Sequence, residues 1–93
     1  MSNDPELAKL RQQMDDVNRR LTSVLHERAQ LARRIGAVKR RAGIATNDPD
    51  RETVMLQAML HDAPADGFSA DALQTILQTV LQASRDIVGG ASD

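Results

Sequence analysis

The 93-residue sequence contains no cysteine and only one aromatic residue, Phe68. Without cysteine there can be no disulfide and no thiolate nucleophile. A single aromatic side chain offers almost no surface for stacking on nucleic-acid bases, and the net charge of −1 argues against a dedicated nucleic-acid binder. We therefore expect no nucleic-acid partner.

The sequence also lacks long apolar runs. No stretch approaches the about 18 apolar residues of a membrane-spanning helix, and the first residues, MSNDPELAKL, lack the apolar core of a signal peptide. We expect a cytoplasmic protein that makes no membrane contact, with residues 1–93 as one domain. A domain of this length buries only about 60 to 65% of its unfolded surface, so a second chain would help to stabilise it.

Charge is unevenly distributed. Residues 1–42 carry ten of the twelve Lys and Arg and five acids, a net charge of +5, whereas residues 43–93 carry a net charge of −6. His26 and His61 have no second ligand at metal spacing, and no glycine-rich phosphate loop or nucleophile–base set is present. We therefore expect no metal, and small anions remain possible ligands of the basic half.

One long helix is predicted to end at Ala42 and to start with Pro5 at its first helical position, after a cap at Asn3 or Asp4. Apolar residues recur there at alternating spacings of three and four, which is typical of an amphipathic helix. Such a helix would be about 57 Å long, whereas a compact domain of this size has a radius of gyration near 12 Å. The helix must project beyond a monomeric fold, which favours a homodimer in which the two long helices cover each other's apolar sides. The apolar positions are Leu7, Leu10, Met14, Val17, Leu21, Val24, Leu31, Ile35, Val38 and Ala42.

Two shorter helices follow. Asp48 is a good helix cap with Pro49 at the first helical position, and Ser69 is a second cap. The last helix has an apolar side from Leu73 to Val88 and ends at the glycine pair 89–90. The predicted fold class is therefore all-α, with one very long and two shorter helices.

Charged and polar residues interrupt the apolar positions at two places. Arg28 occupies a position of the first helix where the spacing predicts an apolar residue, and a buried arginine is costly unless it meets an anion. Lys39, eleven residues later, lies about 20° around and about 16 Å along the same helix, so both cations could contact one small ligand. Arg11 lies about 25 Å from Arg28 along the helix, so it could reach that ligand only from another subunit.

Ser84 interrupts the apolar side of the last helix. A serine in a helix often only donates to the carbonyl oxygen four residues earlier. Next to buried cations and an anionic ligand it could instead act as a hydrogen-bond donor to that ligand.

Four segments together resemble a known family, the all-helical chorismate mutases. They are LAKLRQQMDDVNRRL, LHERAQLARRIGAVK, NDPDRE and the final helix with its serine, and the resemblance covers nearly the whole chain. Members of this family are small intertwined homodimers with a long first helix and two shorter ones. The resemblance implies conversion of chorismate to prephenate in phenylalanine and tyrosine biosynthesis.

That reaction is a pericyclic rearrangement within one substrate, and the resemblance implies no cofactor and no covalent intermediate. Such a reaction needs a dianion held in its reactive shape and stabilisation of the charge that develops on the ether oxygen. By resemblance, Arg28 and Arg11 of the partner subunit would bind the substrate carboxylates with help from Ser84. Lys39 would donate to the ether oxygen.

The resemblance assigns the NDPDRE segment to the substrate ring. Glu52 and Asp48 would meet the ring hydroxyl, Asp48 through its side chain or its backbone. Arg51 would add positive potential and organise the two acids. Lys39, Arg28 and Glu52 are thus the expected catalytic residues.

Val88 departs from the family pattern, which usually has Gln or Glu there as a second donor to the ether oxygen. Losing one such donor typically costs about 10²- to 10³-fold in rate. Three explanations follow. The protein could be a weak chorismate mutase in which water, or a side chain such as Gln82 or Arg85, replaces the missing donor. It could instead be a mutase of 4-amino-4-deoxychorismate, whose ring ammonium would suit Asp48 and Glu52, or an isochorismate pyruvate lyase.

A non-enzymatic alternative is a dimeric helical interaction module. Its basic first helix would bind an acidic partner or RNA. This interpretation explains the charge of residues 1–42 but gives no reason for Arg28 and Ser84 in otherwise apolar positions.

Overall fold

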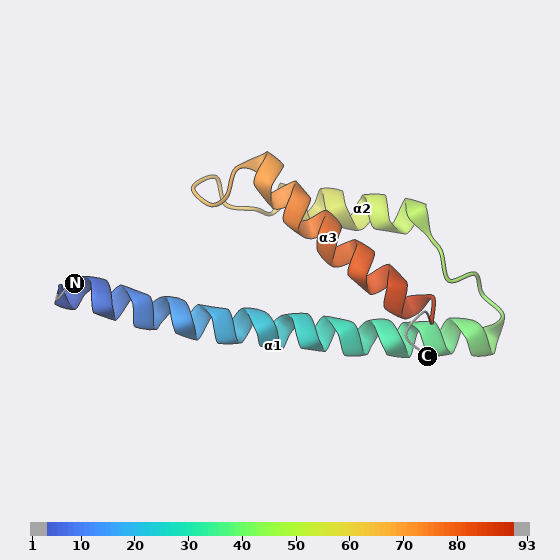
Figure 1. Cartoon of the computed structure of the whole chain (residues 1–93). Helices are drawn as coiled ribbons and strands as arrows, with labels where there is room; N and C mark the ends of the chain where they lie inside the picture. The colour runs from blue at the N-terminus through green and yellow to red at the C-terminus, as the bar shows by residue number, and fades with distance from the viewer. Residues whose placement is uncertain (1–3, 91–93) are drawn as a thin grey trace.

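The computed structural model describes residues 4–90, which form three helices and no strand (Figure 1). In chain order these are α1 (Pro5–Ala42), α2 (Pro49–His61) and α3 (Ala70–Val88). The predicted all-α class, with one long and two shorter helices, is confirmed.

The ends of α1 follow from its sequence. The Asp4 carboxylate accepts hydrogen bonds from the backbone N–H groups of Glu6, at 2.8 Å, and Leu7, at 3.4 Å, and Pro5 occupies the first turn. Gly43 ends the helix with φ 70°, a left-handed conformation that favours glycine. The result is an uninterrupted helix of 38 residues, as the apolar spacing predicts.

The two shorter helices begin at the predicted caps. The Asp48 carboxylate accepts from the backbone N–H of Arg51 at 3.2 Å, and the Ser69 hydroxyl oxygen accepts from that of Ala72, also at 3.2 Å. Each cap satisfies one N–H group that the first turn of a helix leaves without a partner. The caps therefore fix where α2 and α3 start.

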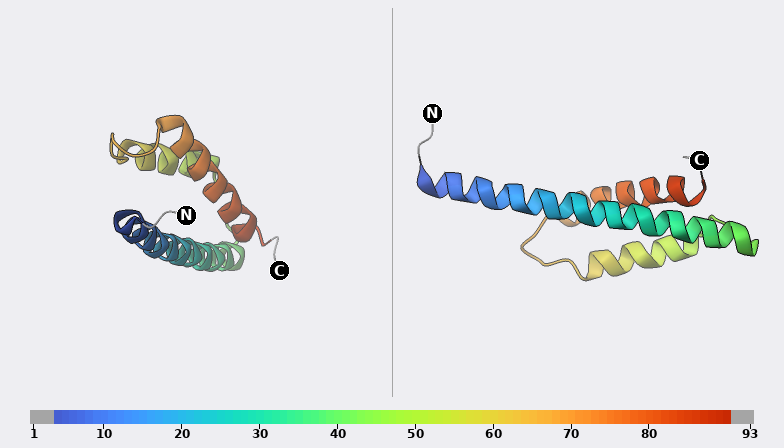
Figure 2. Two further views of the ribbon diagram at one scale, coloured as in Figure 1. Left: turned by 60° about the vertical axis from the view of Figure 1, so that its left-hand side comes forward. Right: turned by 90° about the horizontal axis from the view of Figure 1, so that it is seen from below.

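Helix α3 packs against both other helices, whereas α1 and α2 have no backbone contact in the described part of the chain. Figure 2 (left) shows α3 running from the end of α2 to the C-terminal part of α1. The two helices lie close together at Gly36, where an added Cβ would lie 2.6 Å from the Val88 carbonyl oxygen. Arg40 Nη1 donates to that same oxygen at 3.0 Å.

The chain is elongated and has little core. Its radius of gyration is 17.3 Å and its longest extent is 59 Å, as expected for a helix that projects beyond the rest of the fold. Within residues 4–90, the buried apolar side chains are Ala32 and Leu81. In Figure 1 the N-terminal part of α1 extends past the other helices, and its apolar residues Met14 and Val24 remain 59% and 58% exposed.

Neither a membrane-spanning helix nor a metal-ligand cluster occurs among residues 4–90. None of the three helices is both long and apolar enough to cross a bilayer. His, Asp and Glu do not gather there in groups of three or more that could hold a metal ion.

Candidate active site

A cavity of about 390 Å³ lies between α1, α2 and α3. Its volume is in the range of small-molecule binding sites. Its apolar wall comes from Leu31, Ala32, Ile35, Met55, Leu81 and Val88. Its polar and charged residues are Arg28, Lys39, Thr46, Asp48, Arg51, Glu52, Ser84 and Arg85.

Each helix places its site residues by a simple local rule. Arg28 and Lys39 lie eleven residues apart on α1, which puts them on one side of the helix about 16 Å apart along its axis. Because Asp48 caps α2, the first turn of that helix carries Arg51 and Glu52 beside the cavity. The last turns of α3 contribute Ser84, Arg85 and Val88 to the lining.

The charge of the lining favours an anion. Four cations and two carboxylates line the cavity, a net charge of +2. Within residues 4–90, the side chains of Arg28, Lys39 and Arg51 make no hydrogen bond or ion pair. Three positively charged groups are thus available to a ligand, and Arg28 and Lys39 are half-buried.

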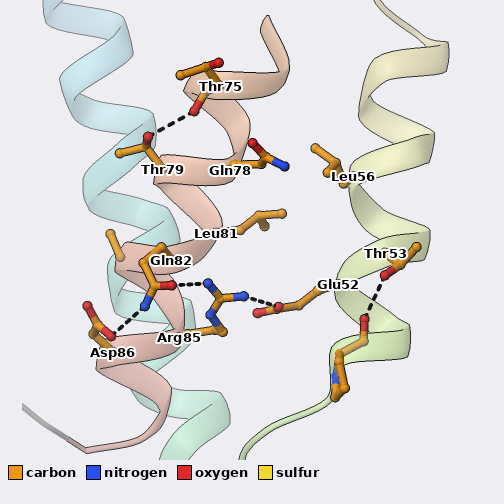
Figure 3. Close-up of a pocket in the computed structure, with 12 residues that line it drawn as sticks. Glu52, Thr53, Leu56, Thr75, Gln78, Thr79, Leu81, Gln82, Arg85 and Asp86 are labelled. Atoms are coloured by element: carbon orange, nitrogen blue, oxygen red, sulfur yellow. Dashed lines mark hydrogen bonds and ion pairs between the residues drawn. The ribbon is translucent and has the colours of Figure 1, made fainter. Parts of the chain in front are cut away.

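Both acids, in contrast, already have partners. Glu52 Oε2 lies 2.5 Å from Arg85 Nη1, and the Glu52 side chain is only 19% exposed. Figure 3 shows Glu52 reaching from α2 toward Arg85 on α3, with Gln82 on the other side of the guanidinium. Asp48 accepts the backbone hydrogen bond that caps α2.

Ser84 lines the cavity, but its hydroxyl donates to the Val80 carbonyl oxygen at 2.9 Å. This is the bond to the carbonyl oxygen four residues earlier, one of the two roles that the sequence analysis considered for Ser84. Without a ligand, Ser84 presents only an acceptor to the cavity. To donate to a carboxylate, the hydroxyl would have to leave Val80.

Val88 contributes an apolar wall without a hydrogen-bond donor. Its side chain is half-buried and lines the cavity, while its carbonyl oxygen accepts from Arg40. Position 88 is therefore both a packing position at the crossing with α1 and part of the site.

Arg11 lies outside the cavity, on the exposed surface of α1. It is 17 residues before Arg28, which corresponds to about 25 Å along a straight helix. Of the eight site residues that the sequence singles out, Val88 among them, seven line the cavity and only Arg11 lies outside it.

Gln82 and Arg85 are the two side chains that the sequence analysis offered as replacements for the missing donor, without a predicted position in the site. Arg85 lines the cavity, whereas Gln82 lines a separate groove of about 720 Å³ between α2 and α3, drawn in Figure 3. One signal points to Arg85: it is one of two basic residues after position 42 and directly follows Ser84. Its ion pair with Glu52, 33 residues away, has no local signature.

Comparisons with known proteins agree on one family. The family described as chorismate mutase type II matches residues 10–88. The T-protein of Enterobacter agglomerans is 35% identical over 79 residues, and the bifunctional chorismate mutase/prephenate dehydratase of Aquifex aeolicus is 31% identical over 81 residues. The solved structure of a chorismate mutase from Thermus thermophilus has a TM-score of 0.83 and 29% sequence identity.

The shares of each chain that are covered differ between these relatives. The matches to the two curated proteins cover 85% and 84% of this chain but only 21% and 22% of theirs. The chain therefore spans about a fifth of the length of these curated relatives. The structural match covers 89% of this chain and 93% of the Thermus thermophilus chain.

Proposed function

The chain belongs to the chorismate mutase type II family, and on this premise we propose that it converts chorismate to prephenate. The observation that carries the proposal is the cavity between the three helices. It gathers Arg28, Lys39 and Arg51, which have no side-chain partner within residues 4–90, next to two carboxylates and a serine. A net charge of +2 complements a substrate with two carboxylates.

The proposed mechanism needs only positioning and electrostatic stabilisation. Arg28 would bind a substrate carboxylate, which compensates the cost of a half-buried guanidinium. Lys39 would donate to the ether oxygen, where negative charge develops as the carbon–oxygen bond breaks. The reacting atoms all belong to one molecule, so holding it in the reactive conformer supplies much of the remaining rate.

The NDPDRE segment would bind the ring hydroxyl. Glu52 and Asp48 stand at the α2 side of the cavity, where a carboxylate oxygen can accept from a hydroxyl. Arg51, in the first turn of α2, adds positive potential there.

We also propose that the active form is a homodimer with shared sites. Large apolar side chains along α1, including Leu10 at 53% and Leu21 at 56% exposed, need a cover that the chain does not supply. A second copy placed antiparallel along α1 would bury these side chains and bring its Arg11 toward the cavity. Because the two subunits are related by a two-fold axis, each would then supply Arg11 to the cavity of the other. We place the reaction in the cytoplasm and in aromatic amino acid biosynthesis, as the sequence predicts.

The direct test is turnover of chorismate. Purified protein is incubated with chorismate, and the loss of the enol-ether absorbance is followed together with the formation of prephenate. Formation of prephenate at a rate above that of the uncatalysed reaction is expected. No acceleration at any protein concentration would contradict the proposed function.

A further inference from the structure

We propose that Arg85 positions Glu52 and compensates its charge, so that the site selects a substrate with a neutral hydroxyl on the ring over one with a ring ammonium. This inference rests on the proposed function and narrows its substrate class. Arg85 is here a positioning and specificity-determining residue that acts through Glu52.

The Arg85 guanidinium contacts two side chains, Glu52 on α2 and Gln82 on α3. Arg85 Nη1 lies 2.5 Å from Glu52 Oε2, and the other terminal nitrogen of the guanidinium donates to Gln82 Oε1 (Figure 3). Gln82 is in turn held by Asp86, which accepts from its amide nitrogen at 3.0 Å. The guanidinium is therefore anchored along α3, and Glu52 is held in one place at the cavity.

The charges around Glu52 disfavour a cationic ring substituent. An ammonium next to Glu52 would meet a carboxylate whose charge Arg85 already compensates, in a cavity with three further cations. Asp48, the other acid, uses one carboxylate oxygen to cap α2. A hydroxyl carries no charge and needs only an acceptor, which Glu52 still offers because a carboxylate has several lone pairs.

The overall charge balance points the same way. Chorismate carries two carboxylates and no cation, a net charge of −2, whereas 4-amino-4-deoxychorismate with its ammonium carries −1. The lining of the cavity, at +2, complements the first better than the second. Replacing Arg85 with a neutral residue would lower the lining to +1 and leave Glu52 as an uncompensated carboxylate, which an ammonium would pair with.

The experiment compares kcat/KM for chorismate and for 4-amino-4-deoxychorismate in the wild type and three variants. Wild type should prefer chorismate. Arg85→Gln should shift the ratio of the two kcat/KM values toward the amino substrate by about tenfold or more, because one charge within contact distance of Glu52 is removed. Arg85→Lys keeps the charge and should stay near the wild-type ratio.

Arg19→Gln is the matched control for loss of one positive charge. Arg19 pairs with Asp16 on the exposed surface of α1, away from the cavity lining, and its substitution should leave the ratio unchanged. Circular dichroism of all variants checks that the helices form.

The outcomes separate this inference from the proposed function. If wild type turns over neither substrate, the proposed function fails. If wild type turns over chorismate and Arg85→Gln leaves the ratio unchanged, the inference is wrong. A wild-type preference for the amino substrate would overturn it without any variant, so the test holds even if Arg85→Gln does not fold.

Discussion

The two halves of α1 follow one apolar spacing but differ in how the chain covers them. Residues 28–42 carry the small residues Ala32 and Gly36, both buried, and α3 crosses there at backbone contact distance. Residues 5–27 carry large apolar side chains at the corresponding positions, and none of them is buried. The close crossing of α3 thus depends on small residues, while large apolar residues of both halves, such as Leu21 and Leu31, stay exposed.

The same division separates the residues that line the cavity from Arg11, which we propose the partner subunit supplies. The half of α1 that meets α3 supplies Arg28 and Lys39 to the cavity, whereas Arg11 lies on the other half, outside the cavity lining. If a second copy covers the extended half, folding and completion of the site become the same event. Each prediction below tests one side of this comparison.

The largest expected effect is on dimer formation, when a charge is introduced on the exposed half of α1, residues 5–27. Leu21→Asp would put two carboxylates into the proposed dimer interface, at a cost of more than about 4 kcal/mol per dimer. We expect loss of the dimer and of most helicity, measured by sedimentation and circular dichroism. Ser23→Asp, about 160° around the helix, introduces the same charge and should leave the dimer intact.

A dimer that persists in Leu21→Asp would show that the apolar side of α1 is not the interface. A lost dimer in Ser23→Asp would show that the effect comes from charge alone.

The next largest expected effect is on kcat, when a residue of the half of α1 that α3 crosses, residues 28–42, is changed. Lys39→Ala should lower kcat by about 10²- to 10³-fold or more, because the donor to the developing charge on the ether oxygen is lost. The dimer should persist. Arg41→Ala removes a cation two residues away, outside the cavity lining, and should retain activity. Retained turnover in Lys39→Ala would mean that another group donates to the ether oxygen.

Val88→Gln tests whether the apolar side chain at position 88 of α3 limits the rate by lacking a hydrogen-bond donor. If a missing donor limits the rate, turnover of chorismate should rise, by up to about 10²-fold. Val88→Met, which has a similar length and no N–H group, should give no rise. The comparison is of kcat for the two variants. Equal rates would indicate that a compensating group already serves the ether oxygen.

The smallest effect should come from the crossing itself. In Gly36→Ala the new Cβ would meet the Val88 carbonyl oxygen at 2.6 Å, so α3 must shift, at a cost of about 1 to 3 kcal/mol. Denaturant unfolding should show this loss. Gly89→Ala, whose Cβ would meet nothing closer than 3.4 Å, should change stability little. Equal stabilities would mean that the crossing tolerates a side chain.

Local rules made most of the fold predictable from the sequence. The caps Asp48 and Ser69 and the left-handed Gly43 each act within a few residues, so their effects can be read without knowing the fold. The length of α1 followed from the apolar spacing for the same reason. The place where α3 crosses α1 did not, although Gly36 was visible as the interior glycine of the long helix.

The site was partly predictable for a different reason. Arg28 and Lys39 lie on one helix, so their spacing alone places them on one side. The ion pair between Glu52 and Arg85 joins residues on two helices, and it depends on how α2 and α3 pack. The resemblance to a family supplied the expected roles that spacing could not, and the role that we propose for Arg85 rests on its contact with Glu52.

The most direct test of the shared site is a subunit-mixing experiment. Arg11→Ala and Lys39→Ala each remove one residue from both sites of a homodimer. In a mixed dimer one site regains both residues, so random mixing should restore about a quarter of wild-type activity. A mixture no more active than the average of the two variants, despite subunit exchange, would contradict the claim that Arg11 completes the partner subunit's site.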